Sequence, residues 1–256
     1  MEPNYQNQNN FNNYNEFSND TRKQGGMGVG NIGDAFSEAA EAIKQKVVAQ
    51  SFLFMMVGLV ITAVGAMVAS EVLLQWMSKS PATLIVLLVA ELAIVVISNA
   101  ALKKNNVALS AGLYTAYSFI NGATLGIVCM AYVETSVTRV FIITAVMFAV
   151  TAFYGLVSKK DLSSIGSLCF MGLIGLILVG VINLFLHSTG LDFLLSIVGV
   201  AVFVGLTAYD TKKIKESVAF ADSSNVTALA LSGAFQLYLD FINLFLYLLR
   251  LFGKRK

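Results

Sequence analysis

The sequence has little charge and almost no proline, which narrows the possible classes of protein. Charged residues make up 12% of the 256 residues, there are two prolines, and hydrophobic residues reach 57%. Soluble domains carry about 25% charged residues, so this composition excludes an ordinary soluble protein. The apolar residues form unbroken runs of about 20 residues, long enough for membrane-crossing helices and unlike the short alternating segments of a barrel. The fold class predicted is an all-α polytopic membrane protein.

Residues that build catalytic and metal sites are also scarce. Cys129 and Cys169 both lie inside apolar runs, where they are expected to be small buried side chains and not a disulfide or metal pair. His187 is the one histidine and follows an apolar run, so we expect an interfacial residue and no zinc site. The sequence contains no Ser-His-Asp set, no H-E-x-x-H motif and no P-loop. We therefore expect no enzyme and no cofactor.

Seven apolar segments follow an N-terminal region rich in Asn and Gln. Residues 1–40 have too little apolar surface for a core, so we predict a disordered cytoplasmic tail followed by a seven-helix transmembrane domain over residues 41–256. The predicted spans are 47–69, 82–102, 107–133, 140–158, 163–186, 193–209 and 228–252. In the first span, Gly58, Thr62 and Gly65 recur in steps of four and three, a stripe of small residues that predicts close helix packing.

Lysine and arginine are unevenly distributed among the connections. Apart from the C-terminal end, eleven lie before the first span or after the second, fourth and sixth spans, whereas the opposite connections hold Lys79 and Arg139. Because cytoplasmic loops collect basic residues, the N-terminus is predicted to be cytoplasmic, in the plasma membrane if the protein is bacterial. The basic end at residues 250–256 would then be exported, so a last segment that re-enters from the cytoplasm is an alternative to seven spans. Topology explains the basic loops, and no nucleic-acid partner is expected.

The last apolar segment carries the carboxylate Asp240 at its centre. Ionisable groups inside a bilayer are costly and usually functional. Gln236, Asp240 and Asn243 are spaced by four and three residues, which places them on one face of a helix. A similar stripe in the third span includes Tyr117 and Asn121, and we expect it to face Asp240. These stripes would line a polar pathway, although Asp240 as a hydrogen-bonded structural carboxylate is an alternative.

Two further carboxylates lie in or beside apolar segments. Glu91, near the middle of the second span, is either a second proton-sensitive residue of the pathway or a structural partner of a Tyr or Ser in the third span. Asp210 directly follows the sixth predicted span. On the residues alone, the favoured interpretation is that it caps a helix end beside the nearby lysines at the membrane interface.

Two segments of the sequence resemble the Bax inhibitor-1 family: GLTAYDTKKIKE (205–216) and LYLDFINLFLYLLRLFG (237–253). Supporting matches are INGATL (120–125) and KKDLSSIG (159–166), and the resemblance covers most of the chain beyond residue 40. It implies a seven-helix bundle in which two three-helix layers surround a central C-terminal helix. It also implies a pH-sensitive calcium leak, with Asp210 and Asp240 as the sensor pair.

One position departs from the family pattern. Bacterial members can place an arginine at the cytoplasmic end of the second span, where it binds the closed aspartate pair. Here that end reads Leu102, Lys103 and Lys104. A lysine can balance charge but lacks the planar two-donor fork of arginine. Lys103 and Lys104 are thus candidate basic partners, and the latch is expected to be weaker or differently placed.

The carboxylates suggest a gating hypothesis and two alternatives. Asp210 and Asp240 in a partly dry site would share one proton, and its loss would leave like charges repelling by about 4 kcal/mol at about 4 Å and an effective dielectric of about 20. This repulsion would open the pathway, and two carboxylates would give calcium a low-affinity site. The alternatives are a proton-coupled cation exchanger that adds Glu91 to a relay, and a non-transporting regulator that binds membrane proteins such as a membrane protease.

Overall fold

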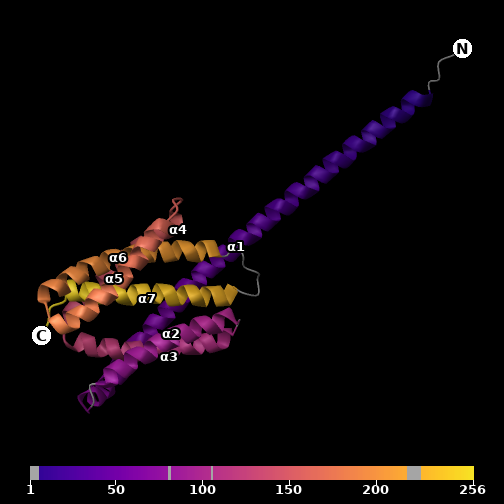
Figure 1. The fold of residues 1–256 in the computed structure, drawn as a ribbon. Coiled ribbons are helices and arrows are strands. Elements are labelled where there is room, and N and C mark those ends of the chain that lie inside the picture. Colours follow the sequence, from indigo (N-terminus) through magenta and orange to yellow (C-terminus); the bar gives the residue numbers. More distant parts are fainter. Residues whose placement is uncertain (1–5, 80–81, 105, 218–225) are drawn as a thin grey trace. The chain divides into compact units, whose positions relative to one another are not determined.

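The computed structural model describes residues 6–79, 82–104, 106–217 and 226–256, and it is built almost entirely of helices (Figure 1). The helices are α1 Gln6–Lys79, α2 Ala82–Lys103, α3 Val107–Met130, α4 Glu134–Val157, α5 Ser163–Leu186, α6 Thr189–Glu216 and α7 Val226–Phe252. Within the described ranges, the only β-type pairing is an isolated bridge between Tyr132 and Arg255. The all-α class predicted from the sequence is confirmed.

Six of these helices are long and apolar enough to cross a membrane: α1, over Ser37–Val68, and α3 to α7. The remaining helix, α2, is 22 residues long, and its apolar part counted in the described residues is the shorter Val89–Leu102. Large apolar side chains such as Phe153 and Phe185 are exposed on the outside of the bundle. Such a surface is expected in lipid, where the surroundings are as apolar as the core. The protein is therefore a polytopic membrane protein.

The N-terminal residues form a compact unit of their own, Met1–Ile43, separate from the unit Lys44–Lys256. Helix α1 begins at Gln6, within the residues predicted to be a disordered tail. The side chains described there, Asp34 and residues 37–40, are exposed, so this part of α1 buries little against a core. The prediction of disorder rests on composition and stays a prediction.

Most helix bounds lie within a few residues of the predicted spans. Helix α1 differs most, because it extends beyond the predicted span 47–69 at both ends, and α6 also differs. Helix α6 continues to Glu216, well past the predicted end at residue 209. Asp210 therefore lies inside a helix, and the alternative that it caps a helix end is wrong. Helix formation depends on backbone hydrogen bonds and not on apolarity, and Lys213 and Lys215 in the last turn interact favourably with the helix dipole.

Helix α7 is the most buried of the six candidate spans. Of its apolar window, 67% is buried, compared with 17 to 44% for the other five candidate spans. It packs against α6, α4, α3 and α2, and Figure 1 shows α7, in yellow, between α6 and the pair α2 and α3. Tyr238 and Leu244 on this helix are fully buried. The C-terminal helix thus holds the centre of the bundle.

Helices α1 and α3 approach closely through the predicted stripe of small residues. A Cβ atom on Gly122 of α3 would lie 2.2 Å from the backbone oxygen of Thr62, and one on Gly65 would lie 2.3 Å from the backbone oxygen of Phe119. The Thr62 hydroxyl lies 3.0 Å from the carbonyl oxygen of Ser118. Only glycine lets the two backbones come this close. This side of the bundle is consequently tight.

Candidate functional site

Asp240 occupies the middle of α7, and its carboxylate is almost completely enclosed. The residue is 3% exposed, and its Oδ2 has no hydrogen-bond partner within the described part of the chain. A buried polar atom without a partner costs about 1–3 kcal/mol, and more when it carries charge. Most buried polar groups are satisfied, so an unsatisfied one at this depth needs a reason. The cavity beside Asp240 offers an explanation for the unsatisfied oxygen.

Asp240 and Asp210 line the same cavity, which has a volume of about 700 Å³ and lies between α5, α6 and α7. The two carboxylates are close enough to interact electrostatically. Gln236 and Asn243, which the sequence placed on one face with Asp240, line this cavity as well. The structure therefore brings together the aspartate pair and the polar stripe of the last helix. Asp210 is half-buried, whereas Asp240 is buried.

Helix α5 supplies a wall of the cavity that the sequence did not reveal. Ser163, Gly166 and Ser167 line it from the first two turns of the helix. A Cβ atom on Gly166 would lie 2.5 Å from the ring of Tyr209, so glycine permits the close contact between α5 and α6. In the sequence, Gly166 and Ser167 follow Ser163 by three and four positions, so these small residues share one face of a helix. Ordinary helix packing uses the same spacing, so the pattern did not identify a cavity wall.

Within the described residues, the basic residue that lines the aspartate cavity is Lys213 of α6. Lys213 lines the cavity, interacts electrostatically with Asp210 one turn before it, and holds its ammonium 5.7 Å from the centroid of the Tyr209 ring. Lys104 is exposed and does not line the cavity, and the side chain of Lys103 lies outside the described residues. The i, i+3 spacing of Asp210 and Lys213 on one helix could have identified this partner.

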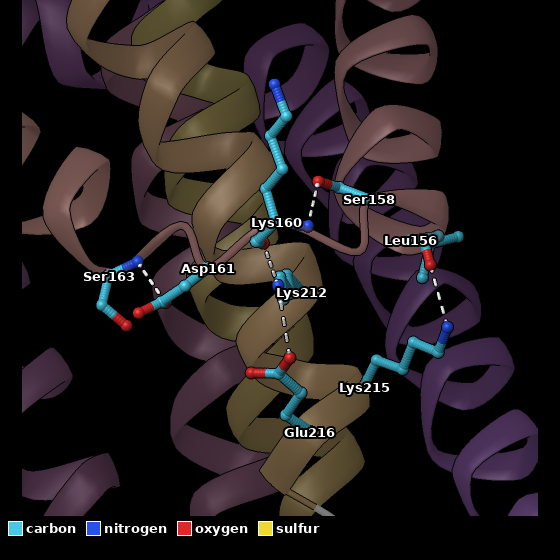
Figure 2. A network of polar contacts seen from close by, with 8 residues as sticks. All are labelled: Leu156, Ser158, Lys160, Asp161, Ser163, Lys212, Lys215 and Glu216. Atoms are coloured by element: carbon cyan, nitrogen blue, oxygen red, sulfur yellow. Dashed lines mark hydrogen bonds and ion pairs between the residues drawn. The ribbon is translucent and has the colours of Figure 1, made fainter.

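The end of α6 is fastened to the connection between α4 and α5 (Figure 2). The ammonium of Lys212 donates to the carbonyl oxygen of Lys160 and lies 3.5 Å from the carboxylate of Glu216. One turn on, Lys215 donates to the carbonyl oxygen of Leu156 over 2.9 Å. These bonds satisfy carbonyl groups at and beyond the end of α4, which otherwise lack helical partners. The turn of α6 that follows Asp210 is thereby held in place.

Asp161 fixes the start of α5 in the same connection. Its Oδ1 accepts a hydrogen bond from the backbone N–H of Ser163 over 2.9 Å (Figure 2). Hydrogen bonding by the Ser163 hydroxyl, and next by that N–H, holds the pKa of the exposed Asp161 carboxyl below its usual range. Since Ser163 lines the aspartate cavity, Asp161 positions one of its walls.

Glu91 takes part in a separate network. Its carboxylate accepts hydrogen bonds from Thr124 at 3.0 Å and from Asn121 at 3.4 Å, both on α3. The amide oxygen of Asn121 accepts from the hydroxyl of Tyr238, which in turn lies 2.6 Å from that of Thr62. Four helices, α1, α2, α3 and α7, are joined by these contacts. This geometry matches the structural interpretation of Glu91, with Thr and Asn as its partners and not Tyr or Ser.

The polar stripe of α3 does not face Asp240, contrary to expectation. Tyr117 packs its ring 5.9 Å from that of Tyr238 and 5.2 Å from that of Phe235, and Asn121 belongs to the Glu91 network. None of these residues lines the aspartate cavity. Tyr238 is two positions from Asp240 and so points to another face of the helix. The error arose because the helical period shows which residues share a face, but not which neighbour that face meets.

The chain matches a protein-family model and is similar to several bacterial proteins. The family model described as inhibitor of apoptosis-promoting Bax1 matches residues 44–256. The chain is 40% identical to the inner membrane protein YbhL of Escherichia coli over 217 residues, which cover 83% of this chain and 93% of that protein. It is 37% identical to a protein of Borreliella burgdorferi over 218 residues, 84% of this chain and 94% of the relative. The chain therefore belongs to the Bax inhibitor-1 family.

Proposed function

We propose that the protein is a pH-sensitive calcium leak, neither an enzyme nor dependent on a cofactor. The observation that supports this most strongly is the cavity shared by Asp210 and Asp240, in which one oxygen of Asp240 has no hydrogen-bond partner among the described residues. Carboxylates on two different helices can respond to a proton by changing the distance between those helices.

For the topology, we propose seven membrane spans with a cytoplasmic N-terminus. Helix α2, at 22 residues, has the length that a crossing needs. With α2 counted as a span, the basic connections after α2, α4 and α6 all fall on the side of the N-terminus, as the distribution of Lys and Arg predicts. The aspartate cavity then opens toward the cytoplasmic end of the bundle.

In the proposed gate, one proton shared by Asp210 and Asp240 keeps α6 and α7 together, and its loss separates them. Two ionised carboxylates at about 4 Å would repel by about 4 kcal/mol at an effective dielectric of about 20. Because Lys212 and Lys215 tie the end of α6 to the connection after α4 and to the last turn of α4, we propose that α7 is the helix that moves. Flux should consequently rise as the pH rises through the titration of the pair.

Calcium fits the ligands that the cavity offers. Calcium prefers oxygen ligands, and the cavity is lined by two carboxylates and by the amides of Gln236 and Asn243. Two carboxylates fall short of a tight calcium site, which usually has six to eight oxygen ligands. Weak binding suits an ion that must leave again. Calcium is thus proposed as the permeant ion and not as a resident metal.

Calcium entry into proteoliposomes loaded with a calcium-sensitive dye tests the proposal. Wild-type flux is expected to rise about tenfold between about pH 6 and pH 8. Asp240→Asn and Asp210→Asn should each remove this pH dependence, because the remaining carboxylate has no second carboxylate to repel it. Glu134→Gln removes an exposed carboxylate far along the chain from the pair and serves as the matched control. Unchanged pH profiles in both aspartate variants would refute the gate.

The same vesicles separate the two alternative functions. A proton-coupled exchanger would move protons in fixed proportion to calcium, which a pH-sensitive dye in the vesicle lumen would report. A regulator of other membrane proteins, such as a membrane protease, would pass neither ion. The Glu91 network ends at Tyr238 and Thr62 and does not include either aspartate, so these contacts do not supply the relay that an exchanger would need.

A further inference from the structure

A second cavity, of about 760 Å³, adjoins the aspartate cavity, since Ile177 and Tyr247 line both, but neither aspartate lines it. It is formed by the end of α5, the start of α6, the end of α7 and the residues after α7. Arg250 and Arg255 line it, together with the apolar side chains Ile177, Val181 and Phe193. Neither Asp210 nor Asp240 takes part, so the aspartate pair of the proposed gate is not part of this site.

The C-terminal residues are anchored in a way that presents Arg255 to this cavity. The N–H of Val133 donates to the carbonyl of Lys254 at 2.9 Å, and the N–H of Lys256 donates to the carbonyl of Ala131 at 3.0 Å. The N–H of Lys254 also donates to the hydroxyl of Ser136 at 2.8 Å. Chain ends usually fray unless something holds them. Here three hydrogen bonds hold the residues on both sides of Arg255.

The charge of the cavity is predominantly positive. Arg250 lies 5.6 Å from the centroid of the Tyr247 ring, and no carboxylate within the described residues forms an ion pair with Arg250 or Arg255. Asp192 is the acidic residue of the lining, and its Oδ1 already accepts a 2.6 Å hydrogen bond from the amide of Asn183. Two guanidinium groups with unused donors can each bind phosphate through paired N–H groups.

The apolar part of the lining faces the lipid phase. Ile177 and Val181 on α5 and Phe193 on α6 are all half exposed or more, on helices whose outer surfaces are apolar. A soluble phosphate compound would gain nothing from such a wall. A phospholipid would place its headgroup at the arginines and an acyl chain along these residues, because basic pockets between membrane helices suit phospholipid headgroups.

We propose that this cavity is a binding site for an anionic membrane phospholipid, with Arg250 and Arg255 binding the headgroup phosphate and the surface of Ile177, Val181 and Phe193 holding an acyl chain. The excess of arginine over the single carboxylate Asp192 favours an anionic over a zwitterionic headgroup. The gate proposed above uses other residues, so failure of either proposal leaves the other standing.

Lipid binding to the full-length protein tests the assignment of the two arginines. The probe is short-chain phosphatidylglycerol, added to protein in a neutral detergent and counted as bound adducts by native mass spectrometry. The variant Arg250→Gln/Arg255→Gln is expected to bind about tenfold more weakly than wild type, since it loses two charge-assisted contacts. Lys254→Gln/Lys256→Gln removes the same charge from side chains that do not line the cavity and should bind as wild type does. Equal weakening in both variants would mean attraction to the basic tail alone and overturn the site.

Two glycines of α5 provide a second test that leaves every charge in place. A Cβ atom on Gly180, which lines the cavity, or on Gly175, which does not, would meet no atom within 4 Å. Gly180→Phe should fill the cavity and weaken binding, whereas Gly175→Phe should leave binding unchanged. If both variants bound the lipid as wild type does, the cavity would not be the site.

Comparison of three probes by melting temperature tests which class of ligand the cavity binds. Short-chain phosphatidylglycerol should raise the melting temperature of wild type more than short-chain phosphatidylcholine at the same concentration. Inorganic phosphate should have little effect, because it lacks the acyl chain. If phosphate alone stabilised the protein as much as the lipid did, in wild type but not in Arg250→Gln/Arg255→Gln, the lipid assignment would be overturned in favour of a site for soluble phosphate.

Discussion

Asp240 and Glu91 are two buried carboxylates that differ in their hydrogen-bond partners. Their exposed fractions are similar, 3% and 7%. Both oxygens of Glu91 accept hydrogen bonds from α3, whereas Oδ2 of Asp240 has no partner in the described ranges and lies beside a cavity with a second carboxylate. Burial alone therefore does not identify a functional carboxylate. The presence or absence of partners separates a group that holds helices together from one that, in the proposed gate, responds to a proton.

The same contrast extends to the two sides of α7. On one side, Tyr238 packs edge-on against Tyr114 and Tyr117, close to the glycine-mediated contact of α1 with α3. On the other side lies the aspartate cavity between α5 and α6. Close-packed interfaces resist rearrangement, whereas a cavity leaves room for a helix to shift. In the proposed gate, the tight side would serve as the support against which α7 moves.

The largest effect should come from removing the support itself. Tyr238→Ala deletes a fully buried ring and the hydroxyl that joins Thr62 to Asn121. Large-to-small substitutions of buried aromatic residues cost about 3–5 kcal/mol, so the melting temperature in detergent should fall sharply. Tyr238→Phe keeps the ring and should lose only about 1 kcal/mol, the size of a hydrogen bond between membrane helices. Equal losses in the two variants would show that the hydroxyl, and not the packing, supports α7.

A second large loss of stability is expected from Gly122→Ala. Its Cβ would lie 2.2 Å from the backbone oxygen of Thr62, so α1 and α3 must separate, at a cost of about 1–3 kcal/mol. Gly112→Ala on the same helix meets no atom within 4 Å and should be neutral or slightly stabilising. Thermal unfolding of the pair measures the difference. Similar melting temperatures would contradict the tight packing on this side.

Matched amide substitutions of the two carboxylates test the comparison directly. Glu91→Gln should lower stability by about 1 kcal/mol, because it disturbs the bonds from Thr124 and Asn121, while the pH dependence of calcium flux persists. Asp240→Asn should have the reverse result, with stability kept or raised and the pH dependence lost, since it replaces a buried ionisable group that has an unsatisfied oxygen by a neutral amide. Loss of the pH dependence in Glu91→Gln would place Glu91 in the gate.

Sequence reasoning predicted the elements of this fold better than their contacts. Long apolar runs located the helices, because membrane helices must satisfy their backbone hydrogen bonds internally. The spacing of Gln236, Asp240 and Asn243 also identified one wall of the cavity. It did not predict that Asn121 would meet Tyr238 instead of Asp240, since a helical period does not specify the neighbouring helix.

A smaller effect, on the gate's pH range, is expected from Lys213→Gln. Lys213 interacts electrostatically with Asp210, and a nearby cation favours the ionised carboxylate. Without it, deprotonation of the pair needs a higher pH, so the pH of half-maximal calcium flux should rise. Lys215→Gln removes the same charge from a residue bonded to the Leu156 carbonyl and should leave that pH nearly unchanged. A downward shift in Lys213→Gln would contradict the role of Lys213 as the basic neighbour of the pair.

The smallest effect is expected for Asp161, a carboxylate that is neither buried nor part of a pair. Bonds from Ser163 hold its pKa below the usual range, so its stabilisation is fully present above the unfolded pKa of about 3.9 and is lost as the pH falls through the folded value. Asp161→Asn should therefore lower the melting temperature slightly at pH 7, and the difference from wild type should shrink below about pH 4. If the difference in melting temperature between Asp161→Asn and wild type stayed constant with pH, the loss of stability would come from local packing and not from the charge of Asp161. The midpoint of calcium flux should not change, because Asp161 orders the start of α5 without lining the aspartate cavity.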